Sequence, residues 1–80
     1  MYKIIRINYD DIKVYDEIVG TYKTYTKAYN EMITLIKQEF EGLFETLETT
    51  NETISIESYN NIFNIMINNK IVTNYKISIE

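Results

Sequence analysis

The sequence predicts a two-layer α+β domain over residues 1–80, in which one helix packs on an antiparallel sheet of about five strands. Three observations predict this fold. Five segments rich in Ile, Tyr and Thr alternate apolar and polar side chains, as half-buried strands do. One central segment has apolar side chains at spacings of three and four, as an amphipathic helix does. Short turns join the strands, so we expect hairpins and the order ββαβββ.

Residues 2–9 and 12–22 are predicted to form the first hairpin, with Asp10-Asp11 as its turn. A two-residue turn sets Asp16 opposite Ile5, which places a carboxylate across from an apolar side chain. The second strand therefore either bulges near Asp16 or lies at an edge of the sheet.

The predicted helix begins after Thr24, whose hydroxyl can accept a hydrogen bond from an amide of the first turn. It covers residues 25–41 and either weakens at Gly42 or continues to about Glu48, and 49–51 end it in both cases. Its apolar stripe consists of Ala28, Met32, Leu35, Ile36 and Phe40, which Leu43 and Leu47 would extend.

Residues 53–59, 62–67 and 71–79 are predicted to form three more strands. A two-residue turn at Asn60-Asn61 and a three-residue turn at 68–70 place the apolar side chains on one face. That face consists of Ile54, Ile56, Phe63, Ile65, Ile67, Ile71, Tyr75, Ile77 and Ile79. The other face mixes polar side chains with Ile62, Met66 and Val72, and we expect it to be solvated or to contact a partner.

The composition lacks the side chains on which most catalytic and metal sites depend. The chain has no His, Cys, Trp or Pro and a single arginine, Arg6. Disulfides are therefore excluded, and neither a structural zinc site nor a cofactor is expected. The net charge of -4 disfavours direct nucleic-acid binding and binding to an anionic membrane. No apolar run approaches the length of a membrane span, so we expect a soluble, cytoplasmic protein without catalytic residues.

Asp10, Asp11, Asp16 and Glu17 form the one carboxylate cluster that could hold a hard cation such as Mg²⁺. No Lys, His or Arg accompanies them in a recognisable catalytic pattern. A hairpin turn followed by a solvated strand end explains the same residues more simply. A metal-dependent nuclease at this cluster is therefore a minor alternative.

Two surfaces are candidates for binding a partner. The first is a series of glutamates at spacings of four, three and four, which are Glu41, Glu45, Glu48 and Glu52. If the helix continues past Gly42, these side chains form an acidic ridge. Such a ridge is either a solvated helix face or a phosphate mimic that enters a basic nucleic-acid channel on another protein. The second surface lies on the other sheet face and consists of Tyr59, Ile62, Met66 and Val72.

The passage "IVGTYKTYTKAY" at residues 18–29 resembles the strand–turn–helix segment of small domains found in phages and mobile elements of low-GC bacteria. The closing "YKISIE" is similar to their terminal strand. Anti-CRISPR proteins are a prominent class among such small acidic phage proteins. The resemblance implies a protein that binds and blocks a larger one, and it transfers no functional residues.

We therefore expect a non-enzymatic inhibitor of a host defence nuclease complex, with a larger protein as its partner. Two alternatives remain open at the level of sequence. One is an oligomer that binds or sequesters a small molecule, and the other is a homodimeric phage protein of unrelated role.

Overall fold

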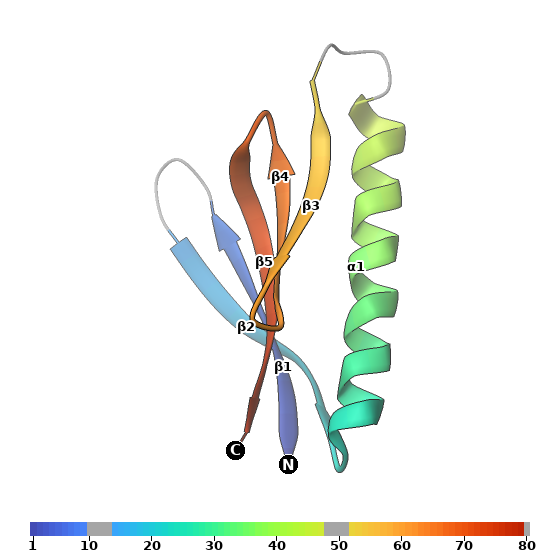
Figure 1. Ribbon diagram of the computed structural model, residues 1–80, viewed down its shortest axis with the longest axis vertical. Helices are drawn as coiled ribbons and strands as arrows, with labels where there is room; N and C mark the ends of the chain where they lie inside the picture. The colour runs from blue at the N-terminus through green and yellow to red at the C-terminus, as the bar shows by residue number, and fades with distance from the viewer. Residues whose placement is uncertain (10–13, 48–51, 80) are drawn as a thin grey trace.

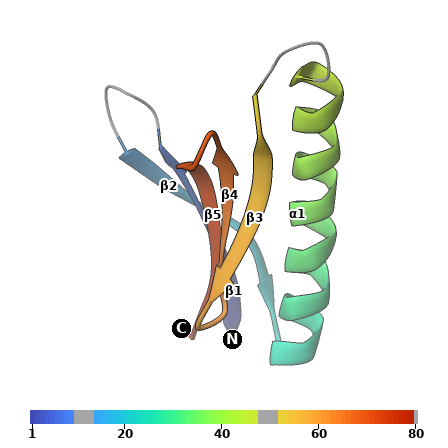
Figure 2. The same cartoon turned by 45° about the horizontal axis from the view of Figure 1, so that its top comes forward.

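The computed structural model describes residues 1–9, 14–47 and 52–79 of the chain. Its elements follow the predicted order ββαβββ, and one helix packs against one face of the sheet (Figures 1 and 2). They are β1 (Tyr2–Tyr9), β2 (Val14–Tyr22), α1 (Tyr25–Leu47), β3 (Ile54–Tyr59), β4 (Ile62–Ile67) and β5 (Lys70–Ile79). The two-layer α+β fold is thereby confirmed.

The five strands form one antiparallel sheet in the order β2-β1-β5-β4-β3. The first and last strands of the chain, β1 and β5, pair in its centre along seven residues from Tyr2 to Asn8. This central pairing joins the N-terminal hairpin to the three C-terminal strands, so that β2 and β3 become the two edges.

Helix α1 begins where the sequence predicts and runs through Gly42. The Thr24 hydroxyl accepts a hydrogen bond from the Lys27 amide at 3.2 Å, which confirms Thr24 as the N-cap. Gly42 lies in the interior of the helix, and a Cβ added there would contact nothing within 4 Å. The glycine therefore lowers helix propensity without ending the helix. The predicted end at 49–51 lies outside the described residues.

The core lies between α1 and the centre of the sheet. Ala28, Met32 and Ile36 of the predicted stripe are buried against Ile4 of β1 and Ile65 of β4. Full burial of an aliphatic side chain of this size contributes about 1.5–3 kcal/mol. Tyr75 completes the buried cluster, and Thr73 is buried beside it.

The first hairpin is displaced by two residues from the predicted register. Tyr9 pairs with Val14, so Ile5 pairs with Ile18 rather than with Asp16. A β-bulge follows between Ile5 and Ile4, where the register shifts by one more residue and Ile4 pairs with Gly20. The shift leaves Val19 as the extra residue, and its side chain packs against the core. Of the two alternatives, the edge is confirmed, because β2 is the first strand of the sheet. The strand also bulges, but at Val19 and not near Asp16, which pairs regularly with Ile7. The predicted turn at 10–11 lies outside the described residues.

The first C-terminal hairpin has the predicted register. Ile54 pairs with Ile67 and Ile56 with Ile65, around a turn at Asn60-Asn61. Both turn residues have positive φ angles, 49° and 62°, as a two-residue hairpin of type I′ requires. Asparagine tolerates this left-handed backbone better than other residues with a side chain, so it fits the turn.

The second C-terminal hairpin has a two-residue turn at Asn68-Asn69, so the predicted three-residue turn is wrong. Ile67 pairs with Lys70, and a register shift follows after Met66, which pairs with Ile71. The extra residue is Val72. Beyond it the strands have the register that the three-residue turn predicts, with Ile65 opposite Thr73. Two assignments of side chains to faces are therefore wrong.

The bulge exchanges the faces of Ile71 and Val72. Ile71 lies opposite Met66 on the open face of the sheet and is exposed. Val72, which the sequence assigned to the open face, packs against the buried core. A bulge places two consecutive residues against one partner residue, so strict alternation fails at this point.

Candidate functional site

Two residues of the acidic ridge lie on the C-terminal half of α1, one on either side of Gly42. Glu41 and Glu45 are exposed, and they are one helical turn apart on the same face of the helix. Glu52 is also exposed, just before β3, whereas Glu48 lies outside the described residues. The helix thus displays two aligned carboxylates, and Glu45 lies beyond Gly42, where the sequence left the continuation of the helix open.

An aromatic pair lies beside these carboxylates. The rings of Phe40 and Phe44 stack with their centroids 6.5 Å apart, and Phe44 is 58% exposed. Together with Glu41 and Glu45 they line a shallow groove of about 360 Å³. Sequence reasoning placed Phe40 in the core stripe and did not single out Phe44, although the spacing of four between them was a signal.

The charge of the ridge opposes the dipole of its own helix. The C-terminal end of a helix carries partial negative charge and is stabilised by basic side chains. The last turn of α1 contains no basic residue, and Glu45 lies in that turn. This arrangement is unfavourable for the helix and concentrates negative potential at one end of the molecule.

The second candidate surface is only partly as expected. Tyr59 is 71% exposed at the end of β3 and pairs with Ile62, so both lie on the open face of the sheet. Ile62 and Met66 are half-buried. Val72 does not belong to this surface, because it packs against the core.

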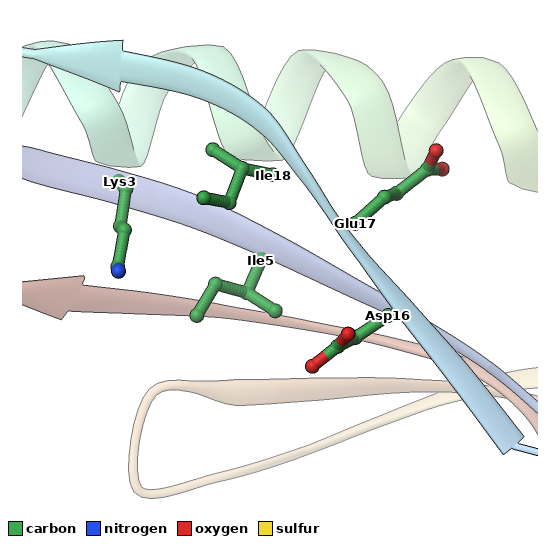
Figure 3. A pocket seen from close by; sticks show the side chains of 5 residues that line it. All are labelled: Lys3, Ile5, Asp16, Glu17 and Ile18. Carbon is green, nitrogen blue, oxygen red and sulfur yellow. The ribbon is translucent and has the colours of Figure 1, made fainter.

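The predicted carboxylate cluster is not assembled in the part of the chain that the structure describes. Asp16 and Glu17 point to opposite sides of β2, as consecutive strand residues do, so they cannot chelate one ion together (Figure 3). Both residues border a shallow pocket, which Lys3, Ile5 and Ile18 also line. Within residues 1–9, 14–47 and 52–79 there is no group of three acidic side chains placed to hold a metal ion. Asp10 and Asp11 lie outside these ranges.

A polar network between helix and sheet was missed by sequence reasoning. The Arg6 Nε donates to Glu39 Oε1 at 2.8 Å and to the Tyr75 hydroxyl at 3.1 Å. Tyr75 in turn donates to Glu39 Oε1 at 3.1 Å, and Arg6 reaches Glu17 of β2 at 3.0 Å. The network therefore ties α1 to β1, β2 and β5.

The electrostatics of this network favour a structural role. Burial by itself would lower the pKa of Arg6, but its hydrogen bond and charge pairing with Glu39 outweigh burial and raise the pKa above its usual range. Burial and the charge of Glu39 raise the pKa of Tyr75 to about 12. At neutral pH the arginine is therefore a cation and the tyrosine a neutral phenol. Neither group is suited to accept a proton from a substrate.

The comparisons with known proteins add no identification. No protein-family model, curated protein or solved structure matches this chain. In the part of the chain that the structure describes, no helix combines the length and the hydropathy needed to cross a bilayer. The function must therefore be argued from the surfaces themselves.

Proposed function

We propose that this chain is a small non-enzymatic inhibitor that binds a larger protein through the acidic ridge of α1. Its target would be a nucleic-acid-binding complex of a host defence system, such as an RNA-guided nuclease. The chain would act in the bacterial cytoplasm in the manner of an anti-CRISPR protein. The ridge would occupy the basic surface that otherwise holds nucleic acid.

The observation that carries this proposal is the position of Glu41 and Glu45. Both side chains are exposed on the half of α1 where the helix dipole is already negative, and the last turn contains no compensating basic residue. The carboxylate of Glu45, which lies in the last turn, destabilises the helix slightly, so a role in stability does not account for it. A line of negative charge on a rigid helix is suited to steer toward a basic channel and to compete with phosphates.

The composition supports a binding role over a catalytic one. The chain lacks His and Cys, and in the half-buried polar network of Arg6, Glu39 and Tyr75 the charges of Arg6 and Glu39 pair with each other. The net charge of -4 matches a basic partner and opposes direct contact with nucleic acid.

The test is competition with nucleic acid on purified RNA-guided nuclease complexes. A fluorescent DNA duplex is bound to each complex, and the chain is titrated against it at two salt concentrations. We expect displacement of the duplex by the parent chain, and weaker displacement with less salt dependence for Glu41→Gln/Glu45→Gln.

A matched control variant removes the same charge elsewhere. Asp16→Asn/Glu57→Gln also raises the net charge by two, but its changes lie on the two edge strands of the sheet. It should inhibit like the parent. Equal inhibition by the parent and both variants would exclude the ridge as the binding surface. A chain that displaces no duplex from any complex would contradict the proposed function itself.

A further inference from the structure

The two edges of the sheet differ in how open they are to another strand. The β2 edge contains the bulge at Val19 and exposes the carboxylates of Asp16 and Glu17, which are features that prevent pairing between sheets. The β3 edge has neither a bulge nor a lysine along Ile54–Tyr59, and its register with β4 is regular throughout. The residues from Ile56 to Tyr59 are all exposed.

The same side of the molecule is apolar in the helix layer. Tyr29 of α1 contacts Phe63 of β4, with ring centroids 6.2 Å apart, so this flank of the helix faces the β4–β3 side of the sheet. Ile33, Phe40 and Phe44 follow Tyr29 on that flank at spacings of four, seven and four. Figure 1 shows α1 running alongside β3.

Ile56 supplies the matching apolar side chain in the sheet layer. It pairs with the fully buried Ile65, so it lies on the helix side of β3, and it is nevertheless 42% exposed. We use the name β3 strip for Ile33, Phe40, Phe44 and Ile56. None of these four side chains carries a charge.

We infer that the β3 strip is an interface between two copies of this chain. In this interface β3 pairs antiparallel with β3 of the second copy around a two-fold axis at Ile56. The two sheets become one continuous ten-stranded sheet, and the two α1 helices lie antiparallel on the same side of it. The interface is isologous, so each strip meets its own copy.

The sequence of β3 is complementary to itself in this register. Ile56 faces Ile56 of the second copy, and Ile54 faces Ser58. Glu57, the one charged residue of β3, faces Ser55 rather than another glutamate, so pairing brings no like charges directly opposite. In a two-residue hairpin the residues next to the turn, here Tyr59 and Ile62, bond to each other. Alternation then directs the backbone groups of Ile54, Ile56 and Ser58 toward the free edge.

The charges beside the strip are of both signs. Lys37 is exposed on this flank of α1, four residues after Ile33. Glu41 and Glu45 line a groove with the two phenylalanines of the strip. Because the interface is isologous, each copy presents the lysine and the two glutamates to the other, so neither sign of charge is left without a counterpart.

The test is the oligomeric state of the full chain in solution, by size-exclusion chromatography with light scattering over a range of concentrations. We expect the parent to approach twice its monomer mass of 9.6 kDa. Ile56→Lys brings two ammonium groups together at the two-fold axis and should weaken dimerisation by roughly tenfold or more. Ile18→Lys is the matched control, because Ile18 is 60% exposed on the other edge strand and on the open sheet face. It should leave the dimer intact.

A second variant keeps the test decisive if Ile56→Lys does not fold. The chain has no cysteine, so Ile56→Cys introduces a single thiol. Directly paired antiparallel residues have Cα atoms about 5.5 Å apart, within the range that a disulfide spans. Ile56→Cys should therefore oxidise to a covalent dimer roughly tenfold faster than Ile18→Cys.

Three outcomes would overturn the inference. The first is a parent chain that stays monomeric at every concentration. The second is a dimer that dissociates in Ile18→Lys but not in Ile56→Lys. The third is an equal rate of oxidation for Ile56→Cys and Ile18→Cys. The variants at Ile56 and Ile18 leave Glu41 and Glu45 in place, and the displacement assay on the nuclease complexes does not measure the mass of the free chain. The proposed function and the dimer therefore stand or fall separately.

Discussion

Replacing Arg6 with Met should destabilise the fold more than replacing Arg6 and Glu39 together. Arg6→Met removes the cation and leaves the Glu39 carboxylate with the Tyr75 hydroxyl as its remaining donor in the network. Glu39 Oε2 is already buried without a hydrogen-bond partner. A charge that loses its partner inside a protein is penalised because it has also lost its water.

The size of the effect follows from the burial of the pair. Breaking a fully buried ion pair costs about 3–5 kcal/mol. The Arg6 and Glu39 side chains are 25% and 18% exposed, so solvent screens part of the charge. We therefore expect a loss of about 2–3 kcal/mol for Arg6→Met. The total stability of an 80-residue domain is about 4–12 kcal/mol, so the loss should be easy to measure.

The second substitution removes the stranded charge. Glu39→Gln keeps an amide oxygen that can accept from Tyr75, so Arg6→Met/Glu39→Gln should recover about 1–2 kcal/mol relative to Arg6→Met. The assay is urea unfolding followed by circular dichroism at neutral pH, with the slope of the transition checked for constancy. If the double variant Arg6→Met/Glu39→Gln were less stable than Arg6→Met alone, the loss in Arg6→Met would not come from an unpaired Glu39 charge.

Three further predictions concern single positions. Ile65→Ala should lower the free energy of unfolding by about 2–5 kcal/mol, because Ile65 is fully buried. Ile18→Ala is the control at an exposed position and should change it by less than about 0.5 kcal/mol. Urea unfolding measures both. Because the pKa of Tyr75 is raised to about 12, the native state keeps this proton while the unfolded chain loses it above pH 10. Stability should therefore fall between about pH 10 and 12, less so in Tyr75→Phe, and alkaline unfolding curves measure this difference. Gly42→Ala should raise the thermal midpoint, with a gain of about 0.5–1 kcal/mol, because the added Cβ meets open space in a helix interior.

Alternation of apolar and polar residues was sufficient to predict the strands and the inward side of β3 and β4. It failed at the two β-bulges. Both bulges occur at a pair of consecutive β-branched apolar residues, Ile18-Val19 in β2 and Ile71-Val72 in β5. In each pair the valine packs against the core and the isoleucine is exposed. The pairs themselves were a local signal, but which residue turns inward depends on packing against α1.

The Arg6 network could not be predicted from local patterns. Arg6 and Glu39 are 33 residues apart, and Arg6 and Tyr75 are 69 apart. Their contact depends on the central pairing of β1 with β5, and sequence alone left the strand order open. The one available signal was Arg6 itself, the single arginine of the chain, which alternation places on the same face of β1 as Ile4.

The acidic ridge makes a last prediction that separates binding from stability. Glu45 lies in the last turn of α1, where its charge opposes the helix dipole, so Glu45→Gln should stabilise the chain by about 0.3–1 kcal/mol at low salt. The gain should shrink as salt is added, because the interaction involves an exposed charge.

Glu31→Gln is the matched control for this prediction. Glu31 lies in the N-terminal half of α1 and pairs with Lys27 at 3.3 Å, so its loss should lower stability by a few tenths of a kcal/mol, about 0.2–0.5. Thermal unfolding of both variants at two salt concentrations measures the two signs. A Glu45→Gln variant less stable than the parent would mean that the carboxylate supports the fold. Stability alone would then account for Glu45, and the acidic ridge would need no role in binding to explain it.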